Sequence, residues 1–235
     1  MSGWAPETCG RLMEVAGETL RPGGLELSEH LLDLGNFRAG SRILDAGCGM
    51  GATLRHLTQA CRMKAVGVDS SIAMLTAAQR HSRELPLVCA ALERLPFGDA
   101  SFDGVICECV LSQTAVTPVL AEFQRVVRVG GLLLLSDLYR RSAGPNPAAA
   151  PAPAERLATK EQTETMLKDA GFMIGHWEDR TRDLQELAFR LIMAPGSTRE
   201  NLYGWREQGG FLNEKEPCAG FRDVGYHLLV ARRSA

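Results

Sequence analysis

The feature that most constrains this chain is a glycine-rich turn, Gly47-Cys48-Gly49-Met50-Gly51, which follows the strand-like run 41–46. Glycine lets a backbone turn tightly and approach a ligand that a Cβ atom would keep away. A lone acid, Asp69, lies about 20 residues further on, at the end of the next strand-like run, where a carboxylate can accept hydrogen bonds from both ribose hydroxyls. This spacing predicts a pocket for a nucleoside-type cofactor.

Strand-like and helix-like runs alternate along most of the chain. The strand-like runs are 41–46, 64–68, 87–90, 102–107, 131–137, 172–177 and 225–231, and the main helix-like runs are 51–60, 72–80, 118–127 and 159–170. The fifth strand-like run is almost pure leucine, which is typical of a strand buried on both faces. The pattern predicts an α/β fold with a doubly wound, Rossmann-like, mostly parallel seven-stranded sheet and an antiparallel last strand.

Composition indicates one domain, 1–235, with four parts. We expect a helical cap over 1–40, a cofactor-binding core over 41–141, a Pro/Ala loop over 142–158, and a helical insertion over 178–224 before the last strand, long enough for a lid. Thr159-x-x-Gln162 is a capping pattern that predicts a helix start.

The charge balance excludes some partners. With 26 Lys plus Arg against 28 Asp plus Glu, a net charge of −2 gives no general attraction to nucleic acid or anionic lipid. The apolar runs are far shorter than the ~20 residues of a bilayer span, and the N-terminus lacks a basic-then-apolar leader. We therefore expect a cytoplasmic protein with a small-molecule partner, no nucleic acid and no membrane; the oligomeric state stays open.

Seven cysteines are scattered without the paired C-x-x-C spacing of a structural zinc site; they are Cys9, Cys48, Cys61, Cys89, Cys107, Cys109 and Cys218. The sequence predicts reduced thiols and no metal site.

Four ordered blocks carry a family resemblance. They are Leu44-Asp45-Ala46-Gly47-Cys48-Gly49-Met50-Gly51, then Gly67-Val68-Asp69-Ser70-Ser71, then Leu95-Pro96-Phe97 followed by Ser101-Phe102-Asp103, then Arg125-Val126-Val127-Arg128-Val129-Gly130-Gly131. Over roughly 24–137 the chain resembles a class I S-adenosylmethionine-dependent methyltransferase of the small-molecule, methyltransferase type 11-like group. The resemblance implies transfer of a methyl group from S-adenosylmethionine to an acceptor, most simply a small molecule, leaving S-adenosylhomocysteine.

The resemblance also implies site residues. Those implied for the cofactor are Asp45, Gly47, Cys48, Gly49, Asp69, Ser70, Met74, Ala91, Leu92 and Cys107. Asp45 would hold the ammonium of the methionine moiety and Asp69 the ribose. Ala91 stands where the family commonly has an acid for the adenine amino group, so backbone groups of Ala91 and Leu92 would take that contact.

The acceptor is expected beside Cys109 and Ser112, which follow the fourth strand. Displacement at a sulfonium mainly requires positioning and desolvation, so a catalytic base is optional. Glu108 is the candidate base, although a hydrogen bond from Glu108 to the cofactor ammonium or to a nearby backbone group is the favoured interpretation. The turn Arg21-Pro22-Gly23-Gly24 either closes over the cofactor or simply joins two helices.

Several alternatives stay open. A dinucleotide-binding domain needs GxGxxG, whereas the turn here reads GxGxG and follows Asp45, which would repel a pyrophosphate. A protein or RNA methyltransferase lacks support from a basic patch, and a non-catalytic S-adenosylmethionine-binding accessory protein would keep the same motifs. An arsenite or thiol methyltransferase would gather Cys48, Cys107, Cys109 and Cys218 around a soft acceptor.

Overall fold

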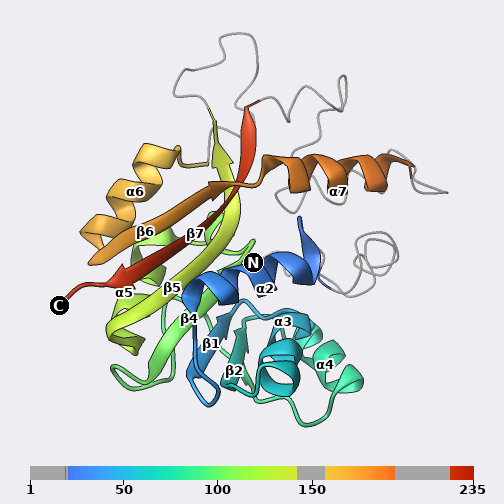
Figure 1. The fold of residues 1–235 in the computed structure, drawn as a ribbon. Coiled ribbons are helices and arrows are strands. Elements are labelled where there is room, and N and C mark those ends of the chain that lie inside the picture. The colour runs from blue at the N-terminus through green and yellow to red at the C-terminus, as the bar shows by residue number, and fades with distance from the viewer. Residues whose placement is uncertain (1–18, 20, 142–156, 194–222) are drawn as a thin grey trace.

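Seven strands form one sheet in the order β3-β2-β1-β4-β5-β7-β6 (Figure 1). The computed structural model describes residue 19 and residues 21–141, 157–193 and 223–235. The strands are β1 (Arg42–Ala46), β2 (Lys64–Asp69), β3 (Leu87–Cys89), β4 (Phe102–Glu108), β5 (Val127–Arg140), β6 (Phe172–Asp179) and β7 (Val224–Arg233). In this spatial order, the five strands β3, β2, β1, β4 and β5 pair in parallel with their neighbours. Strand β7 pairs antiparallel to both β5 and β6. The predicted fold class is confirmed.

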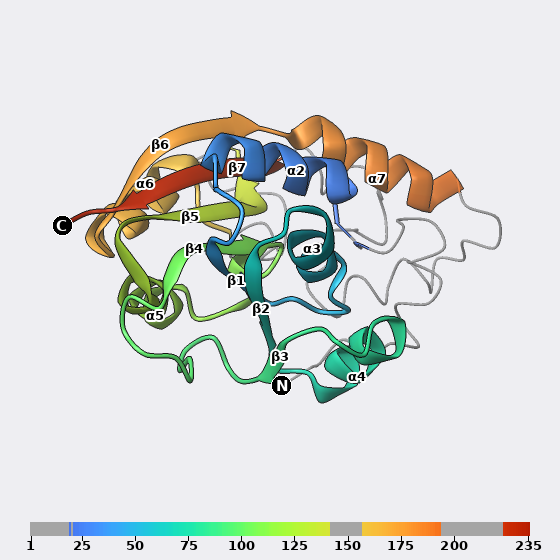
Figure 2. The same ribbon diagram turned by 60° about the horizontal axis from the view of Figure 1, so that its bottom comes forward.

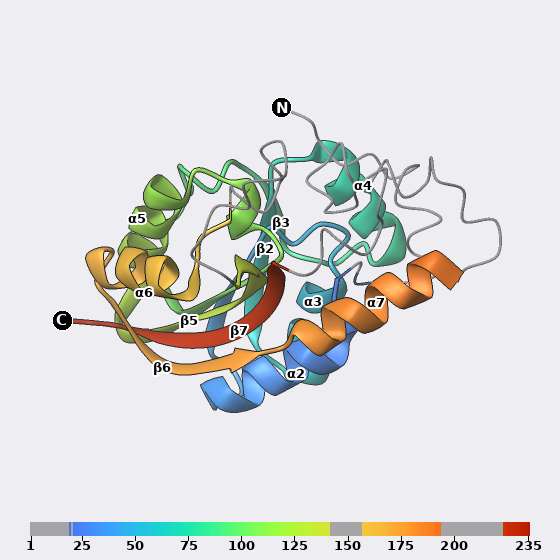
Figure 3. The ribbon, with the colours of Figure 1, turned by 90° about the horizontal axis from the view of Figure 1, so that it is seen from above.

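Helices cover both faces of the sheet. They are α2 (Gly24–Gly35), α3 (Ala52–Arg55), the π-helical turn η1 (His56–Ala60), α4 (Ile72–His81), the 3₁₀ turn η2 (Leu111–Gln113), α5 (Val116–Val126), α6 (Lys160–Asp169) and α7 (Thr181–Met193). Helices α5 and α6 pack on one face, and α2, α3 and α7 pack on the other (Figure 3). Figure 2 shows α2 and α7 on the same side of the sheet.

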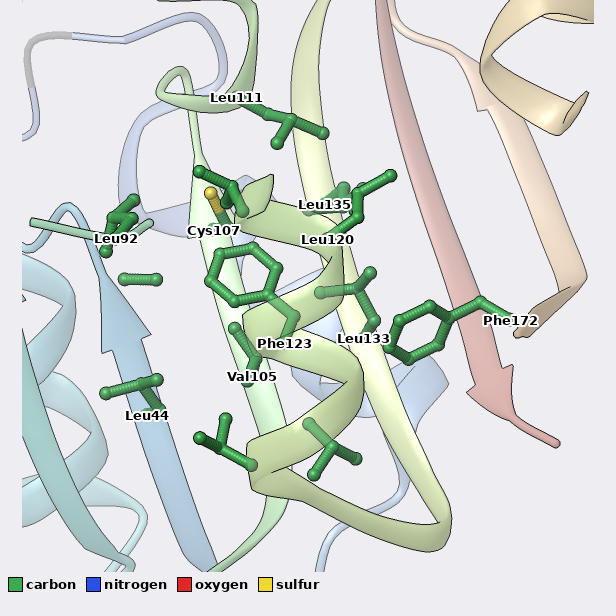
Figure 4. Packing of buried hydrophobic residues seen from close by; sticks show 14 of the residues in the cluster. Leu44, Leu92, Val105, Cys107, Leu111, Leu120, Phe123, Leu133, Leu135 and Phe172 are labelled. Carbon is green, nitrogen blue, oxygen red and sulfur yellow. The ribbon is translucent and has the colours of Figure 1, made fainter. Parts of the chain in front are cut away.

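Two apolar layers hold the sheet between these helices. The leucines of β5 alternate, so that Leu133 and Leu135 join the layer under α5 and α6, and Leu132 and Leu134 join the opposite layer. Figure 4 shows Phe123 of α5 in the first layer, packed among side chains of β4 and β5. Burial of both faces confirms the interpretation of the leucine run, and it fixes the carboxyl ends of the strands relative to one another.

The element boundaries differ from prediction mainly at β5. The sequence predicts a strand over 131–137, whereas β5 starts at Val127, directly after α5, and continues to Arg140. Pairing supplies the reason, because Val127 pairs with Phe102 of β4 and Arg140 pairs with Val224 of β7. The predicted helix 51–60 instead divides into α3 and the π-helical turn η1.

The cap helix α2 and the capping box of α6 are present as predicted. Thr159 accepts a hydrogen bond from the Gln162 N–H, and the Gln162 side chain accepts one from the Thr159 N–H. The first part of the predicted cap 1–40 and most of the loop 142–158 lie outside the described residues. The later part of the predicted insertion 178–224 does so too, and α7 lies in its first part. Within the described ranges no helix is both long and apolar enough to cross a membrane.

Candidate cofactor site

The glycine turn joins β1 to α3 in a conformation that side chains would obstruct. Gly47 has φ 77°, and a Cβ atom there would collide with the side chain of Val110. The N–H groups of Gly47 and Cys48 donate to the Val68 carbonyl oxygen at 2.8 and 3.0 Å. These bonds fix the turn at the carboxyl end of β2 and leave backbone, not side chains, at the edge of the sheet.

Asp69 ends β2 and connects the glycine turn to the start of α4. Its Oδ2 accepts a hydrogen bond from the Gly49 N–H at 2.9 Å, and its Oδ1 accepts one from the Ser71 N–H at 2.8 Å. The Ser71 hydroxyl oxygen accepts from the Met74 N–H and so caps α4. The carboxylate is half-buried and held in one orientation, as a ribose-binding acid requires.

Asp45 lies at the end of β1 with one carboxylate oxygen unpaired. The residue is 4% exposed, and its buried Oδ2 has no hydrogen-bond partner in the described part of the chain. Burial raises the pKa of Asp45 to about 8; the negative charge of Glu108 adds to this rise and the positive charge of Arg21 opposes it. A buried, unpaired carboxylate oxygen is complementary to an ammonium group.

Glu108, the last residue of β4, belongs to a buried network that the sequence analysis did not predict. Its Oε2 lies 3.0 Å from Nη2 of Arg21 and accepts a hydrogen bond from the Thr53 hydroxyl at 3.0 Å. Its Oε1 accepts one from the Ser28 hydroxyl, also at 3.0 Å. The Arg21 and Glu108 side chains are only 8% and 5% exposed. The sequence signal available for this network was Arg21, which stands directly before the turn Pro22-Gly23-Gly24.

The two predicted cofactor-side thiols point into the protein. Cys107 is 1% exposed and lies in the apolar layer beside Phe123 (Figure 4). The sulfur of Cys48 packs over Gly67 of β2, 2.8 Å from the position that a Cβ atom would take there. Any contact between the cofactor and either residue would therefore involve backbone atoms of that residue.

The residues predicted near the sugar and adenine line the edge next to β2 and β3. Met74 is buried, and its methyl group lies 3.5 Å from the position of a Cβ atom on Gly49. Leu92 is buried, whereas Ser70 and Ala91 are exposed. This mixture suits a pocket with an apolar floor and open backbone groups at its rim.

The predicted acceptor residues form hydrogen bonds with side chains of β5 and β7. Cys109 has the positive φ of 57°, and its sulfur lies 3.2 Å from the Tyr226 hydroxyl of β7. The Ser112 N–H and hydroxyl both donate to the Asp137 carboxylate of β5, at 2.8 and 2.6 Å. Burial raises the pKa of Asp137, and these hydrogen bonds oppose the rise. The loop after β4 is thus anchored to β5 and β7.

Of the four cysteines in the soft-acceptor alternative, the structure describes Cys48, Cys107 and Cys109. Burial raises the pKa of Cys48, Cys107 and Cys109, which are therefore protonated thiols at neutral pH. No three cysteine, histidine or acidic side chains within the described ranges are placed to hold a metal ion. Cys218 lies outside those ranges.

His227 of β7, to which the sequence assigned no role, is a buried unpaired group. It is 3% exposed, its ring stacks on Trp177 at 4.3 Å, and neither ring nitrogen has a hydrogen-bond partner among the described residues. Burial lowers the pKa of His227 to about 3, so the imidazole is neutral.

Known proteins share these motifs and this fold. Residues 44–135 match a family model described as a methyltransferase domain. The chain is 27% identical over 201 residues to phosphoethanolamine N-methyltransferase 3 of Arabidopsis thaliana, covering 81% of this chain and 41% of that protein. It is 26% identical over 243 residues to O-methyltransferase resE of Aspergillus sclerotiorum, covering 98% and 87%.

A solved structure shows the same fold. Phosphoethanolamine N-methyltransferase 2 of Haemonchus contortus, in complex with S-adenosyl-L-methionine, superposes with a TM-score of 0.76 at 19% identity, over 95% of this chain and 56% of that one. The chain thus spans less than two thirds of the length of either phosphoethanolamine enzyme. The family match over residues 44–135, the relatives and the shared fold thus support the resemblance to class I S-adenosylmethionine-dependent methyltransferases.

Proposed function

We propose that this protein transfers a methyl group from S-adenosylmethionine to a small-molecule acceptor. The observation that carries the proposal is the buried, unpaired oxygen of Asp45 beside a glycine turn that hydrogen bonds to the backbone of β2 fix in place. An ammonium on a nucleoside fits this acid, and Asp69 lies across the same turn, where ribose hydroxyls would bind.

The chain's own residues would hold the cofactor by its two ends. Asp45 would pair with the ammonium, Asp69 would accept from the ribose hydroxyls, and backbone groups near Ala91 and Leu92 would meet the adenine. When bound, S-adenosylmethionine supplies a methyl group activated by its positive sulfonium. The protein's contribution is to orient donor and acceptor and to exclude water from between them.

Glu108 is better suited to holding Arg21 than to accepting a proton. Its carboxylate already bonds to Arg21, Thr53 and Ser28, so removing a proton from the acceptor would require breaking this network. An acceptor that is a good nucleophile needs no base. We therefore assign Glu108 a positioning role, and its catalytic role stays the alternative.

The names of the relatives support a small acceptor, since one is a phosphoethanolamine N-methyltransferase and another an O-methyltransferase. The net charge of −2 favours a small molecule over nucleic acid as the partner. Cys109 and Ser112 are the proposed acceptor-side residues. A cytoplasmic location and the limits of the single domain stay predictions.

The test is transfer of a labelled methyl group from S-adenosylmethionine into small amines, phenols, thiols, arsenite and a fractionated cell extract. We expect label in the low-molecular-mass fraction, and less of it with an Asp69→Ala variant at a cofactor concentration that does not saturate the unaltered protein. Label only in protein or RNA would support a macromolecular methyltransferase instead. Cofactor binding without any transfer would support an accessory protein, and label in arsenite would revive the soft-acceptor alternative.

A further inference from the structure

The loop after β4 (residues 109–113) begins with a residue in a strained backbone conformation. Cys109 has φ 57°, in the left-handed region that favours glycine. Its N–H donates to the Ser136 carbonyl oxygen at 2.7 Å, and its carbonyl oxygen accepts from Nε2 of Gln113, also at 2.7 Å. Its sulfur lies 3.2 Å from the Tyr226 hydroxyl. A strained conformation persists only where its surroundings fix it, and these three contacts do so.

The Tyr226 hydroxyl reaches from β7 to the ends of two other strands. Tyr226 is 0% exposed, and its hydroxyl donates to Oγ of Ser136 on β5 at 2.9 Å. Burial raises the pKa of Tyr226 and of Cys109, so both groups keep their protons at neutral pH. The phenol has one proton, which goes to Ser136, so the Cys109 S–H donates to the phenol oxygen.

The rest of Tyr226 is fixed by contacts that do not involve its hydroxyl. Tyr226 pairs with Leu138 of β5. Its N–H donates to Oγ1 of Thr181 at 3.2 Å, and its carbonyl oxygen accepts from the Arg180 N–H at 2.7 Å. Removing the hydroxyl alone should therefore leave β7 in place and break one side-chain link to the loop after β4.

Cys109 stands between two residues that border the proposed cofactor site. Val110 follows it and lies against the glycine turn, since a Cβ atom on Gly47 would lie 2.4 Å from Cγ2 of Val110. Glu108 precedes it and is paired with Arg21. A change in the backbone of Cys109 would move both neighbours, because φ and ψ of one residue set the direction of the chain on either side.

We propose that Tyr226 is a positioning residue for the methyl donor: its hydroxyl holds Cys109, and through Cys109 it sets the place of Val110 against the glycine turn. The inference rests on the proposed function and extends it to a residue of the last strand. Because the effect passes through Cys109, removing either partner should have a similar consequence, and removing both should add little.

The experiment measures the affinity for S-adenosylhomocysteine by isothermal titration calorimetry. Tyr226→Phe should bind it roughly 3- to 30-fold more weakly than the unaltered protein, the range expected for a residue that acts through a packed network. Cys109→Ala should show a similar loss. The double variant should bind about as weakly as the weaker single variant, because the two changes break the same link.

Tyr139→Phe is the matched control. Tyr139 is also a buried tyrosine, 8% exposed, and its hydroxyl donates to Oδ2 of Asp179 at 2.9 Å, away from the loop after β4. Both tyrosine variants lose one hydroxyl from a hydrogen bond, so both should unfold at a lower denaturant concentration than the unaltered protein. Tyr139→Phe should nevertheless keep its affinity for S-adenosylhomocysteine within about 2-fold, because it shares no partner with the site.

The outcomes separate this inference from the proposed function. Equal losses of affinity in Tyr226→Phe and Tyr139→Phe would show that the Tyr226 hydroxyl only supports the fold, and so would an unchanged affinity in both. A double variant whose loss is the product of the two single losses would show that Tyr226 does not act through Cys109. Each of these results overturns the inference while the proposed function stands. Failure of the unaltered protein to bind S-adenosylhomocysteine overturns both.

Discussion

Binding of the cofactor should release a proton near neutral pH, because Asp45 must lose one to pair with an ammonium. Burial and the charge of Glu108 raise the pKa of Asp45 to about 8. The carboxyl group of the free protein is therefore mostly protonated at pH 7. Its ionised form, which binds the ammonium, is about 10% populated at pH 7 and about 1% at pH 6.

The expected affinity follows from these populations. The affinity for S-adenosylhomocysteine should rise about ninefold from pH 6 to pH 7, or about 1.3 kcal/mol, and about fivefold from pH 7 to pH 8, and it should level off above about pH 9. At pH 7 about 0.9 proton should be released for each ligand bound. Calorimetry in buffers of different ionisation enthalpy measures both quantities.

The same pKa makes an opposite prediction for stability without the ligand. An acid whose folded pKa lies above its unfolded value destabilises the folded state as pH rises between the two values. The cofactor-free protein should therefore lose stability from about pH 4 to about pH 8 through Asp45, and Asp45→Asn should remove this part of the dependence. Binding that is independent of pH from 6 to 8, without proton release, would refute the reasoning.

Two further substitutions and one labelling experiment test particular contacts. Gly47→Ala should lower the free energy of unfolding by roughly 2 kcal/mol or more, measured by denaturant titration, because φ is 77° and the new methyl group meets Val110. His227→Phe should raise that free energy by about 1 kcal/mol at pH 7, since it removes unpaired buried nitrogens, and the variant should lose less stability from pH 6 to pH 4 because the pKa of His227 is about 3. Mass-spectrometric mapping after iodoacetamide treatment of the native protein should find Cys89 modified and Cys107 protected, because Cys89 is exposed and Cys107 is buried; equal modification would contradict the burial of Cys107.

Much of the fold was predictable because its signals are local. The leucine run of β5 indicated a strand buried on both faces, and the glycine turn marked the passage from β1 to α3. The ends of β5 were not predictable from the sequence, because Val127 and Arg140 become strand residues only through pairing with Phe102 and Val224. Such pairing depends on partners that are distant in the chain.

The candidate site was also only partly predictable from the sequence. Asp45 and Asp69 stand at fixed distances from the glycine turn, so their neighbourhood followed from the motif, and the structure brings both to one edge of the sheet. Arg21 and Glu108 are 87 residues apart in the sequence, and neither carries a local signal for an ion pair. Their pairing arises only when α2 packs on the sheet, which is why the sequence suggested Glu108 as a base or as a partner of the cofactor ammonium or of a nearby backbone group.

The central claim is that the glycine turn and Asp69 form the binding site for S-adenosylmethionine. Its most direct test is the affinity of S-adenosylhomocysteine for the unaltered protein and for Asp69→Ala, with the fold of each checked by circular dichroism. We predict measurable binding to the first and a loss of about 1 to 3 kcal/mol in the second, the cost of unpairing buried polar groups. Equal affinities in two folded proteins, or no binding to the unaltered protein, would contradict the claim.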